Sequence, residues 1–194
     1  MNKINTVFVD SDSTIYDFMT QLAKLEGFEN TRDMLFHANA NQIGIQDYIG
    51  ELTLKHRFNT LFSHGDILPD GEKLLIDLFE YKKKYDFSIV ILSALYGTMD
   101  HYCDISKRKI AYDKVNWYQK TKINGISIYE QVDEIKFVNT WKDKLKFATD
   151  DSILIDDFIG TRNVYVEANK KFVHFTSHED AIAQLDAYLT GEVA

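Results

Sequence analysis

Polar side chains that suit phosphate and metal chemistry follow three short apolar runs of the chain. They are Asp10 and Asp12 after the first run, Ser93 after the second, and Asp156 and Asp157 after the third. A sixth candidate, Lys144, precedes the third run. Carboxylate oxygens are the ligands that Mg²⁺ prefers, and it shares its coordination shell with water and phosphate. A hydroxyl and an ammonium group can hold the remaining phosphoryl oxygens. The pattern therefore predicts a magnesium-assisted site for a phosphorylated molecule.

The elements that would position these residues are strands alternating with helices. Continuous apolar runs typical of strands buried on both faces cover residues 7–9, 88–92, 153–155 and 172–175. A further strand lies at either 126–128 or 135–138, and we favour the second. Helical periodicity predicts helices at residues 72–83, 106–118, 142–148 and 178–189, the last with Ser177 as N-cap. This alternation predicts an α/β sandwich with a parallel sheet, whose carboxyl strand ends would bring the polar groups together.

One connection is far longer than a crossover between parallel strands needs. About 70 residues separate the first strand from the second, whereas about 10–12 suffice for a crossover. We interpret residues 15–85 as a helical cap inserted after the first strand, above the sheet edge where open α/β folds bind ligands. Residues 1–14 and 86–194 would then form the catalytic core.

The motif order resembles that of the haloacid dehalogenase (HAD) superfamily of phosphotransferases. The order is Asp-x-Asp-x-Thr at residues 10–14, a strand ending in Ser93, then Lys144, then the Asp-Asp pair at 156–157. Within that superfamily the chain looks most like the 5'(3')-deoxyribonucleotidases and their phage and bacterial relatives. Residues 10–18, DSDSTIYDF, look like their first motif, and Asp143-Lys144 followed by LIDD looks like their last. Ile67 to Gly71 resembles the return from their cap. The resemblance implies a Rossmannoid three-layer sandwich with a small helical cap.

The resemblance also implies a two-step phosphomonoester hydrolysis. Asp10 would attack phosphorus to form an aspartyl-phosphate, which water then hydrolyses. Asp12 would protonate the leaving alcohol, and later activate the water. The same two residues would bind Mg²⁺, Asp12 through its backbone carbonyl.

Other residues acquire binding roles from the same resemblance. Ser93 and Lys144 would grip the phosphate, Asp156 would complete the metal site, and Asp157 would bind a metal-bound water or orient Asp156. Phe18 matches an aromatic residue that stacks on the base of a nucleotide. Lys142 and Lys146 stay open as alternatives to Lys144.

The sequence departs from the family pattern in its turns. Ser11 and Ser13 stand where relatives have a bulkier residue and a glycine, and Ala94 replaces a second hydroxyl that some nucleotidases use. A calcium loop starting at Asp10 is excluded, because it would need Gly at Ile15 and Glu at Gln21.

The favoured substrates are nucleoside monophosphates, particularly deoxyribonucleotides. Sugar phosphates, nucleic-acid ends and a catalytically silent nucleotide-binding or assembly module are the alternatives.

Composition restricts the partners. The chain has 194 residues, a formal net charge of −8 and 45% apolar residues, so it can fill a core, and its acidity disfavours binding to a polynucleotide. The apolar stretch at 87–96 is too short to cross a bilayer, and the start of the chain does not resemble a signal peptide. With Cys103 as its single cysteine, the chain has no internal disulfide, and we expect a cytoplasmic protein. The sequence leaves a homodimer open.

Overall fold

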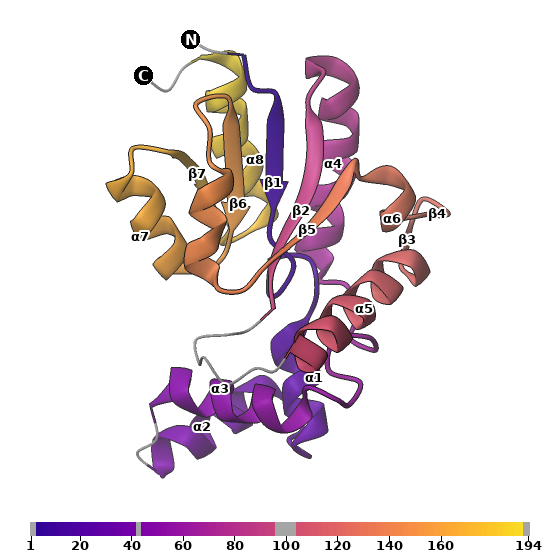
Figure 1. Ribbon diagram of the computed structural model, residues 1–194, viewed down its shortest axis with the longest axis vertical. Coiled ribbons are helices and arrows are strands. Elements are labelled where there is room, and N and C mark those ends of the chain that lie inside the picture. The colour runs from indigo at the N-terminus through magenta and orange to yellow at the C-terminus, as the bar shows by residue number, and fades with distance from the viewer. Residues whose placement is uncertain (1–2, 42–43, 96–103, 192–194) are drawn as a thin grey trace.

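A five-stranded parallel sheet forms the centre of the molecule (Figure 1), with strand order β5-β2-β1-β6-β7. This computed structural model describes residues 3–41, 44–95 and 104–191, so Cys103 lies outside the described residues. The strands are β1 (Thr6–Val9), β2 (Ser88–Ala94), β5 (Glu134–Val138), β6 (Ser152–Asp156) and β7 (Lys171–His174). The predicted α/β fold with a parallel sheet is confirmed.

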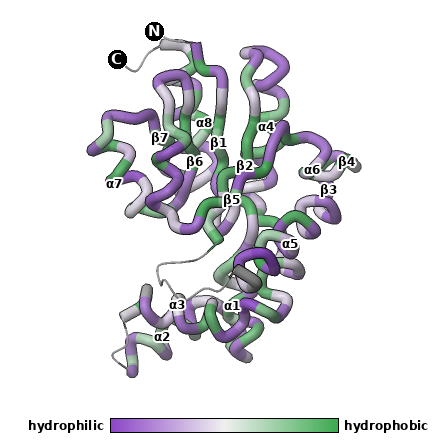
Figure 2. The backbone as a smooth tube through the Cα atoms, viewed as in Figure 1, coloured by the Kyte–Doolittle hydropathy of each residue, from purple (hydrophilic) through white to green (hydrophobic). Residues whose placement is uncertain are grey.

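The central strands are apolar without interruption because both faces of the sheet are covered. In β1, Val7 and Val9 pack in a core that includes Leu74 of α4 and Leu185 of α8. Phe8, between them, points into a second core on the opposite face. Figure 2 shows hydrophobic residues gathered along β1 and β2. The sheet is therefore the middle of three layers, which explains why its strands lack the polar alternation of a one-sided sheet.

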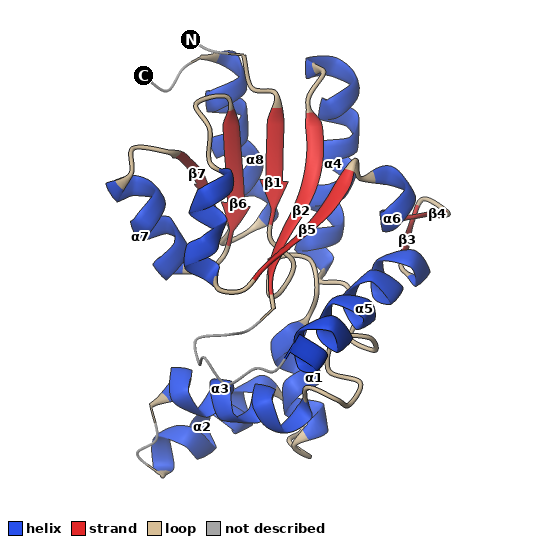
Figure 3. Cartoon of the chain, viewed as in Figure 1, coloured by secondary structure: helices blue, strands red, loops and turns tan. Residues whose placement is uncertain are grey.

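Helices cover the two faces and one end of the sheet (Figure 3). Their bounds are α1 (Phe18–Leu25), α2 (Thr31–Ala40), α3 (Ile45–His56), α4 (Pro69–Tyr85), α5 (Asp104–Lys120), α6 (Ile128–Gln131), the 3-10 helix η1 (Trp141–Phe147), α7 (Ile159–Glu167) and α8 (His178–Thr190). Helices α4 and α8 pack together on one face, and η1 and α7 pack together on the other.

The helical insertion after β1 is also confirmed. Helices α1, α2 and α3, called the cap helices below, lie beyond the carboxyl ends of the strands (Figure 1). The side chain of Asp17 caps α1 by accepting from Thr20 N, and that of Asn30 caps α2 by accepting from Asp33 N. The exact division into a core of 1–14 and 86–194 and a cap of 15–85 stays a prediction. The last helix of the insertion, α4, packs on α8 and β2 of the core.

The structure resolves the open choices of secondary structure. The fifth strand is the favoured one, now β5, whereas Ile126–Ser127 forms β4 of a small antiparallel hairpin with β3 (Lys122–Ile123). Ser177 caps α8 as expected, through a hydrogen bond from Asp180 N. The predicted helix at 142–148 is the 3-10 helix η1, and helix α7 was not among the predicted helices. In the described part of the chain, no helix is long and apolar enough to cross a membrane.

Gly71, in the first turn of α4, lies against the loop that carries Asp12. A Cβ atom at Gly71 would lie 2.3 Å from the carbonyl oxygen of Thr14 and 2.8 Å from the Cα of Ile15. Both of these atoms belong to the backbone, which has little freedom to move away. The glycine therefore permits the close contact between the start of α4 and the loop after β1.

We expect Gly71→Ala to lower the free energy of unfolding by about 1–3 kcal/mol, because the added methyl group overpacks this contact. The matched control is Gly50→Ala in α3, where an added Cβ meets nothing within 4 Å. That change should leave the free energy of unfolding unchanged or raise it by up to about 1 kcal/mol, since alanine favours helix. Urea unfolding measures both variants, and equal effects at the two positions would contradict the close contact.

Candidate active site

The register of the sheet brings the predicted site residues to one edge. In β1, Val9 is level with Ile91 of β2 and Ile155 of β6, and the backbone N–H of Asp10 donates to the carbonyl of Ile155 at 2.9 Å. Asp10 therefore leaves the central strand beside Asp156, and β2 delivers Ser93 at the same end. More than 60 positions separate Asp10 from Ser93, and Ser93 from Asp156, yet the parallel pairing of their strands makes them neighbours.

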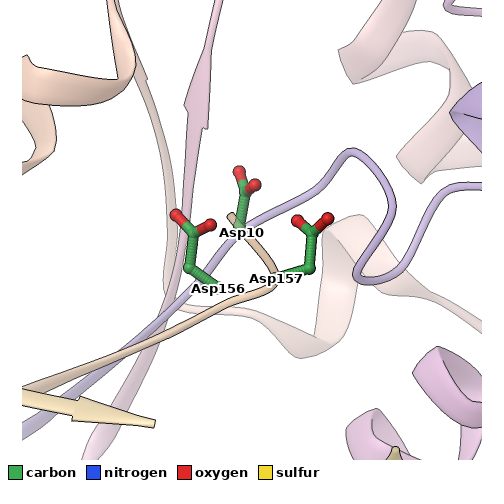
Figure 4. A group of neighbouring side chains, drawn as sticks. All are labelled: Asp10, Asp156 and Asp157. Atoms are coloured by element: carbon green, nitrogen blue, oxygen red, sulfur yellow. The ribbon is translucent and has the colours of Figure 1, made fainter. Parts of the chain in front are cut away.

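Three carboxylates at this edge form a group that could hold a metal ion. Side-chain oxygens of Asp10, Asp156 and Asp157 all lie within 4.8 Å of one another. Figure 4 shows the three carboxylates at the ends of neighbouring strands, pointing toward the same side. Asp10 and Asp156 are buried and Asp157 is partly buried. Hard oxygen donors from a few carboxylates, with the remaining positions left for water and phosphate, are the donor set that suits Mg²⁺.

Lys144 on η1 lies between two of these acids. Its Nζ is 2.7 Å from Asp10 Oδ1 and 2.6 Å from Asp156 Oδ2, and its side chain is buried. Burial alone would lower the pKa of Lys144, but the two carboxylates outweigh it and hold the pKa above its usual range. The ammonium of Lys146, by contrast, is exposed and pairs with Asp143. The structure thus brings Lys144 to the acids, and its contact with a phosphate group stays a prediction.

Asp12 occupies a separate position in the turn after β1. It is buried, and one of its oxygens, Oδ2, accepts a short hydrogen bond from Nζ of Lys114. The same Nζ donates to Oγ of Ser93 at 2.7 Å and to the carbonyl of Ala94 at 3.1 Å. Burial raises the pKa of Asp12, with Lys114 opposing that rise. Ser93 and Asp12 are therefore joined through a second buried lysine.

Lys114 lies in the site, although the motifs of the sequence do not single it out as a candidate. It lies in α5, in a segment rich in charged residues where a lysine ordinarily solvates a helix surface. Its signal in the sequence is the spacing to Trp117 and Tyr118, which places all three side chains on one side of the helix. Trp117 Nε1 donates to the carbonyl of Gly65 at 2.8 Å, and the Tyr118 hydroxyl donates to Ser11 Oγ at 2.6 Å.

A residue in the left-handed region shapes the turn after β1. Ser13 has φ = +63°, in the left-handed region, and three successive N–H groups from Thr14 to Tyr16 donate to the carbonyl of Ser11. Glycine adopts this conformation without steric cost, whereas serine does so less readily. The turn therefore forms with serine, in a conformation that glycine would adopt at lower cost.

Phe18 is packed in the interior. Its side chain is 2% exposed, and its ring stacks on Phe62 with centroids 5.9 Å apart and planes 19° apart. The Nζ of Lys114 lies 4.9 Å from the centroid of the Phe62 ring, so this aromatic pair borders the site. The contact with a nucleotide base stays a prediction, and the geometry shows Phe18 in the role of a core residue.

The charges of the site favour a divalent cation. Asp10, Asp12, Asp156 and Asp157 supply four carboxylates, whereas Lys114 and Lys144 supply two ammonium groups. When all are ionised, the acids exceed the bases by two charges (4 − 2 = 2). Burial raises the pKa of Asp157 to about 8, and the nearby Asp10 and Asp156 add to the rise. The residues present therefore fit a bound Mg²⁺, which would offset this excess.

Comparisons with known proteins find likeness only among solved structures. No family model matches the chain, and no curated protein does. A hydrolase from Streptococcus pneumoniae TIGR4 aligns at a TM-score of 0.49 and 12% identity, over 95% of this chain and 100% of that one. A HAD-superfamily hydrolase, subfamily IA, from Geobacter sulfurreducens PCA aligns at 0.44 and 11%, over 94% and 97%.

A third structure, the HAD-hydrolase YfnB from Bacillus subtilis bound to magnesium, aligns at a TM-score of 0.42 and 13% identity, over 81% of this chain and 80% of that one. Likenesses at such low identities and TM-scores assign neither a family nor an activity to the chain. The chemical reading of the site rests on its own residues: the carboxylate triad that could bind Mg²⁺, and the two buried lysines beside it.

The raised pKa of Asp157 predicts how stability depends on pH without metal. An unfolded aspartate loses its proton near pH 4, whereas folded Asp157 keeps it until about pH 8. Across this window the folded state binds the extra proton, so the free energy of unfolding should fall as pH rises. Urea unfolding in a chelator between pH 5 and 8 measures the decline. Asp157→Asn should make it shallower, and added Mg²⁺ should restore stability at pH 8. A variant whose decline is as steep as that of the wild type would contradict the prediction.

Proposed function

We propose that the chain is a Mg²⁺-dependent phosphomonoester hydrolase of the HAD type. The observation that carries the proposal is the placement of Lys144 between Asp10 and Asp156, with Asp157 alongside and Asp12 two residues beyond Asp10. This constellation combines a nucleophile, a metal-binding group and a cation for phosphate at the carboxyl edge of a parallel sheet, where open α/β folds bind ligands.

The residues divide the reaction between them. Asp10 attacks phosphorus and forms an aspartyl-phosphate while Asp12 protonates the leaving alcohol. Asp12 then takes a proton from the water that hydrolyses the intermediate. Ser93 and Lys144 hold the phosphoryl oxygens. Asp10, Asp156 and the backbone carbonyl of Asp12 would hold Mg²⁺, which would supply positive charge that offsets the phosphate, and Asp157 would bind a metal-bound water or orient Asp156.

We further propose that the substrates are small phosphate esters, with nucleoside monophosphates, particularly deoxyribonucleotides, as the favoured class. The support is the resemblance of residues 10–18 and of the Asp143-Lys144 and 154–157 motifs to the deoxyribonucleotidases. The cap helices lie over the site edge, where they can shield the reaction from bulk water. The net charge of −8 favours a small ligand over a polynucleotide.

Phosphate release from 4-nitrophenyl phosphate tests the reaction. Activity should require Mg²⁺, disappear with a chelator, and fall at least about 1,000-fold in Asp10→Asn because the nucleophile is lost. Asp86→Asn is the control. This aspartate is exposed and follows α4 at the other end of the sheet, so the activity of the variant should match that of the wild type. A wild-type protein that releases no phosphate from many different esters would favour a silent binding or assembly module.

A substrate panel tests the narrower proposal. We expect kcat/KM to be higher for deoxyribonucleoside monophosphates than for sugar phosphates, with ribonucleotides measured in parallel to detect a sugar preference. Phosphate release at equal Mg²⁺ gives the comparison. Faster turnover of sugar phosphates or of 5'-phosphorylated oligonucleotides would overturn the nucleotidase assignment and leave the phosphatase assignment standing.

A further inference from the structure

Lys114 holds the two groups that flank the reacting phosphate in the proposed function. Its side chain is 3% exposed, and its ammonium donates to Asp12 Oδ2, to Ser93 Oγ and to the carbonyl of Ala94. A buried ammonium is costly unless paired, so these contacts fix the lysine. Because Ser93 Oγ accepts from Lys114, the hydroxyl proton of Ser93 can be directed to another acceptor, such as a phosphoryl oxygen.

The two oxygens of Asp12 have different surroundings. Oδ2 is bound by Lys114, whereas Oδ1 is buried and has no hydrogen-bond partner among the described residues. A buried carboxylate oxygen without a partner is costly and calls for an explanation. A proton shared with a substrate would supply one: Oδ1 is the oxygen that remains to exchange a proton with a leaving group or a water.

The helix that carries Lys114 is tied to the turn of Asp12 at two further points. Tyr118, four residues on, donates to Ser11, and Trp117 packs edge-on against Tyr16 with centroids 4.9 Å apart. The turn between β1 and α1 is thus held along one side of α5. This anchoring restricts how Asp12 can move relative to the lysine, which is what a positioning role needs.

We propose that Lys114 is the positioning residue for the general acid: it binds Oδ2 of Asp12 and Oγ of Ser93, so that Oδ1 of Asp12 transfers the proton. The inference rests on the proposed phosphatase function. It adds a cation distinct from Lys144, which pairs with Asp10 and Asp156 on the other side of the site.

The proton transfer accompanies the first phosphoryl transfer. An oxygen of Asp10 forms a bond to phosphorus while the ester P–O bond breaks, and the leaving oxygen keeps that electron pair. The leaving oxygen takes the proton from Oδ1 of Asp12, which becomes a carboxylate. Lys114 already donates to this carboxylate and stabilises the charge that develops on it. In the second step water attacks phosphorus, its proton returns to Asp12, and the bond to Asp10 breaks.

Leaving-group dependence separates this role from phosphate binding. 4-Nitrophenolate leaves without a proton, whereas an alkoxide needs one. In Lys114→Met we expect kcat/KM for a simple alkyl phosphate to fall at least about 100-fold, and for 4-nitrophenyl phosphate less than about tenfold. The parameter kcat/KM is used because it reports the steps through the first phosphoryl transfer. Lys120→Met, an exposed lysine at the end of the same helix, is the control and should leave both values unchanged.

Lys114→Met leaves a buried carboxylate without its cation and can therefore fail to fold. The double variant, Asp12→Asn with Lys114→Met, removes both charges of the buried pair and gives a second test. A lysine that acts through Asp12 predicts equal rates for Asp12→Asn and for the double variant. Equal losses for both esters in Lys114→Met, or a further loss in the double variant, would overturn the positioning role. A wild type that hydrolyses neither ester overturns the proposed function, and this inference with it. An active wild type with an unchanged ester ratio in Lys114→Met overturns the inference alone.

Discussion

Four carboxylates lie close together at one edge of the sheet, and the elements packed around them offset their negative charge. Asp10, Asp12 and Asp156 are buried there and Asp157 lies beside them, although an isolated buried carboxylate costs several kcal/mol. Two buried lysines offset this cost: Lys144 on η1 and Lys114 on α5. The site therefore needs both helices in place, and a divalent cation would complete its charge balance.

The two lysines bind different members of the acidic group. Lys144 binds Asp10 and Asp156, which belong to the group that could hold a metal, whereas Lys114 binds Asp12 and Ser93. Two aspartates that are only two residues apart would otherwise feel nearly the same electrostatic field. Separate cations give the two aspartates separate surroundings, and different surroundings allow two carboxylates to play different parts in one reaction.

The connection between core and cap helices depends on close backbone packing as well as on charge. The loop after β1 contains a left-handed Ser13, passes over the start of α4 at Gly71, and is held by α5 through Tyr118. Trp117 reaches from α5 to the carbonyl of Gly65, just before the return to the core. A change at any of these contacts would move Asp12 before it moved Asp10, because Asp10 is held in register by β1 and β6.

The sequence predicts the strands, the layered fold and the acids of the site, because apolar runs and the aspartates that follow them are local patterns. Parallel pairing of the strands then brings these aspartates together. It also singled out Lys144 through its place ahead of the third acidic run. Only the tertiary structure decided that Lys114 belongs to the site and that Phe18 is packed on Phe62. Whether a helical lysine is solvated or buried depends on what packs against its helix. The acceptors of Lys114 include Asp12 and Ser93, which lie 102 and 21 positions away in the chain.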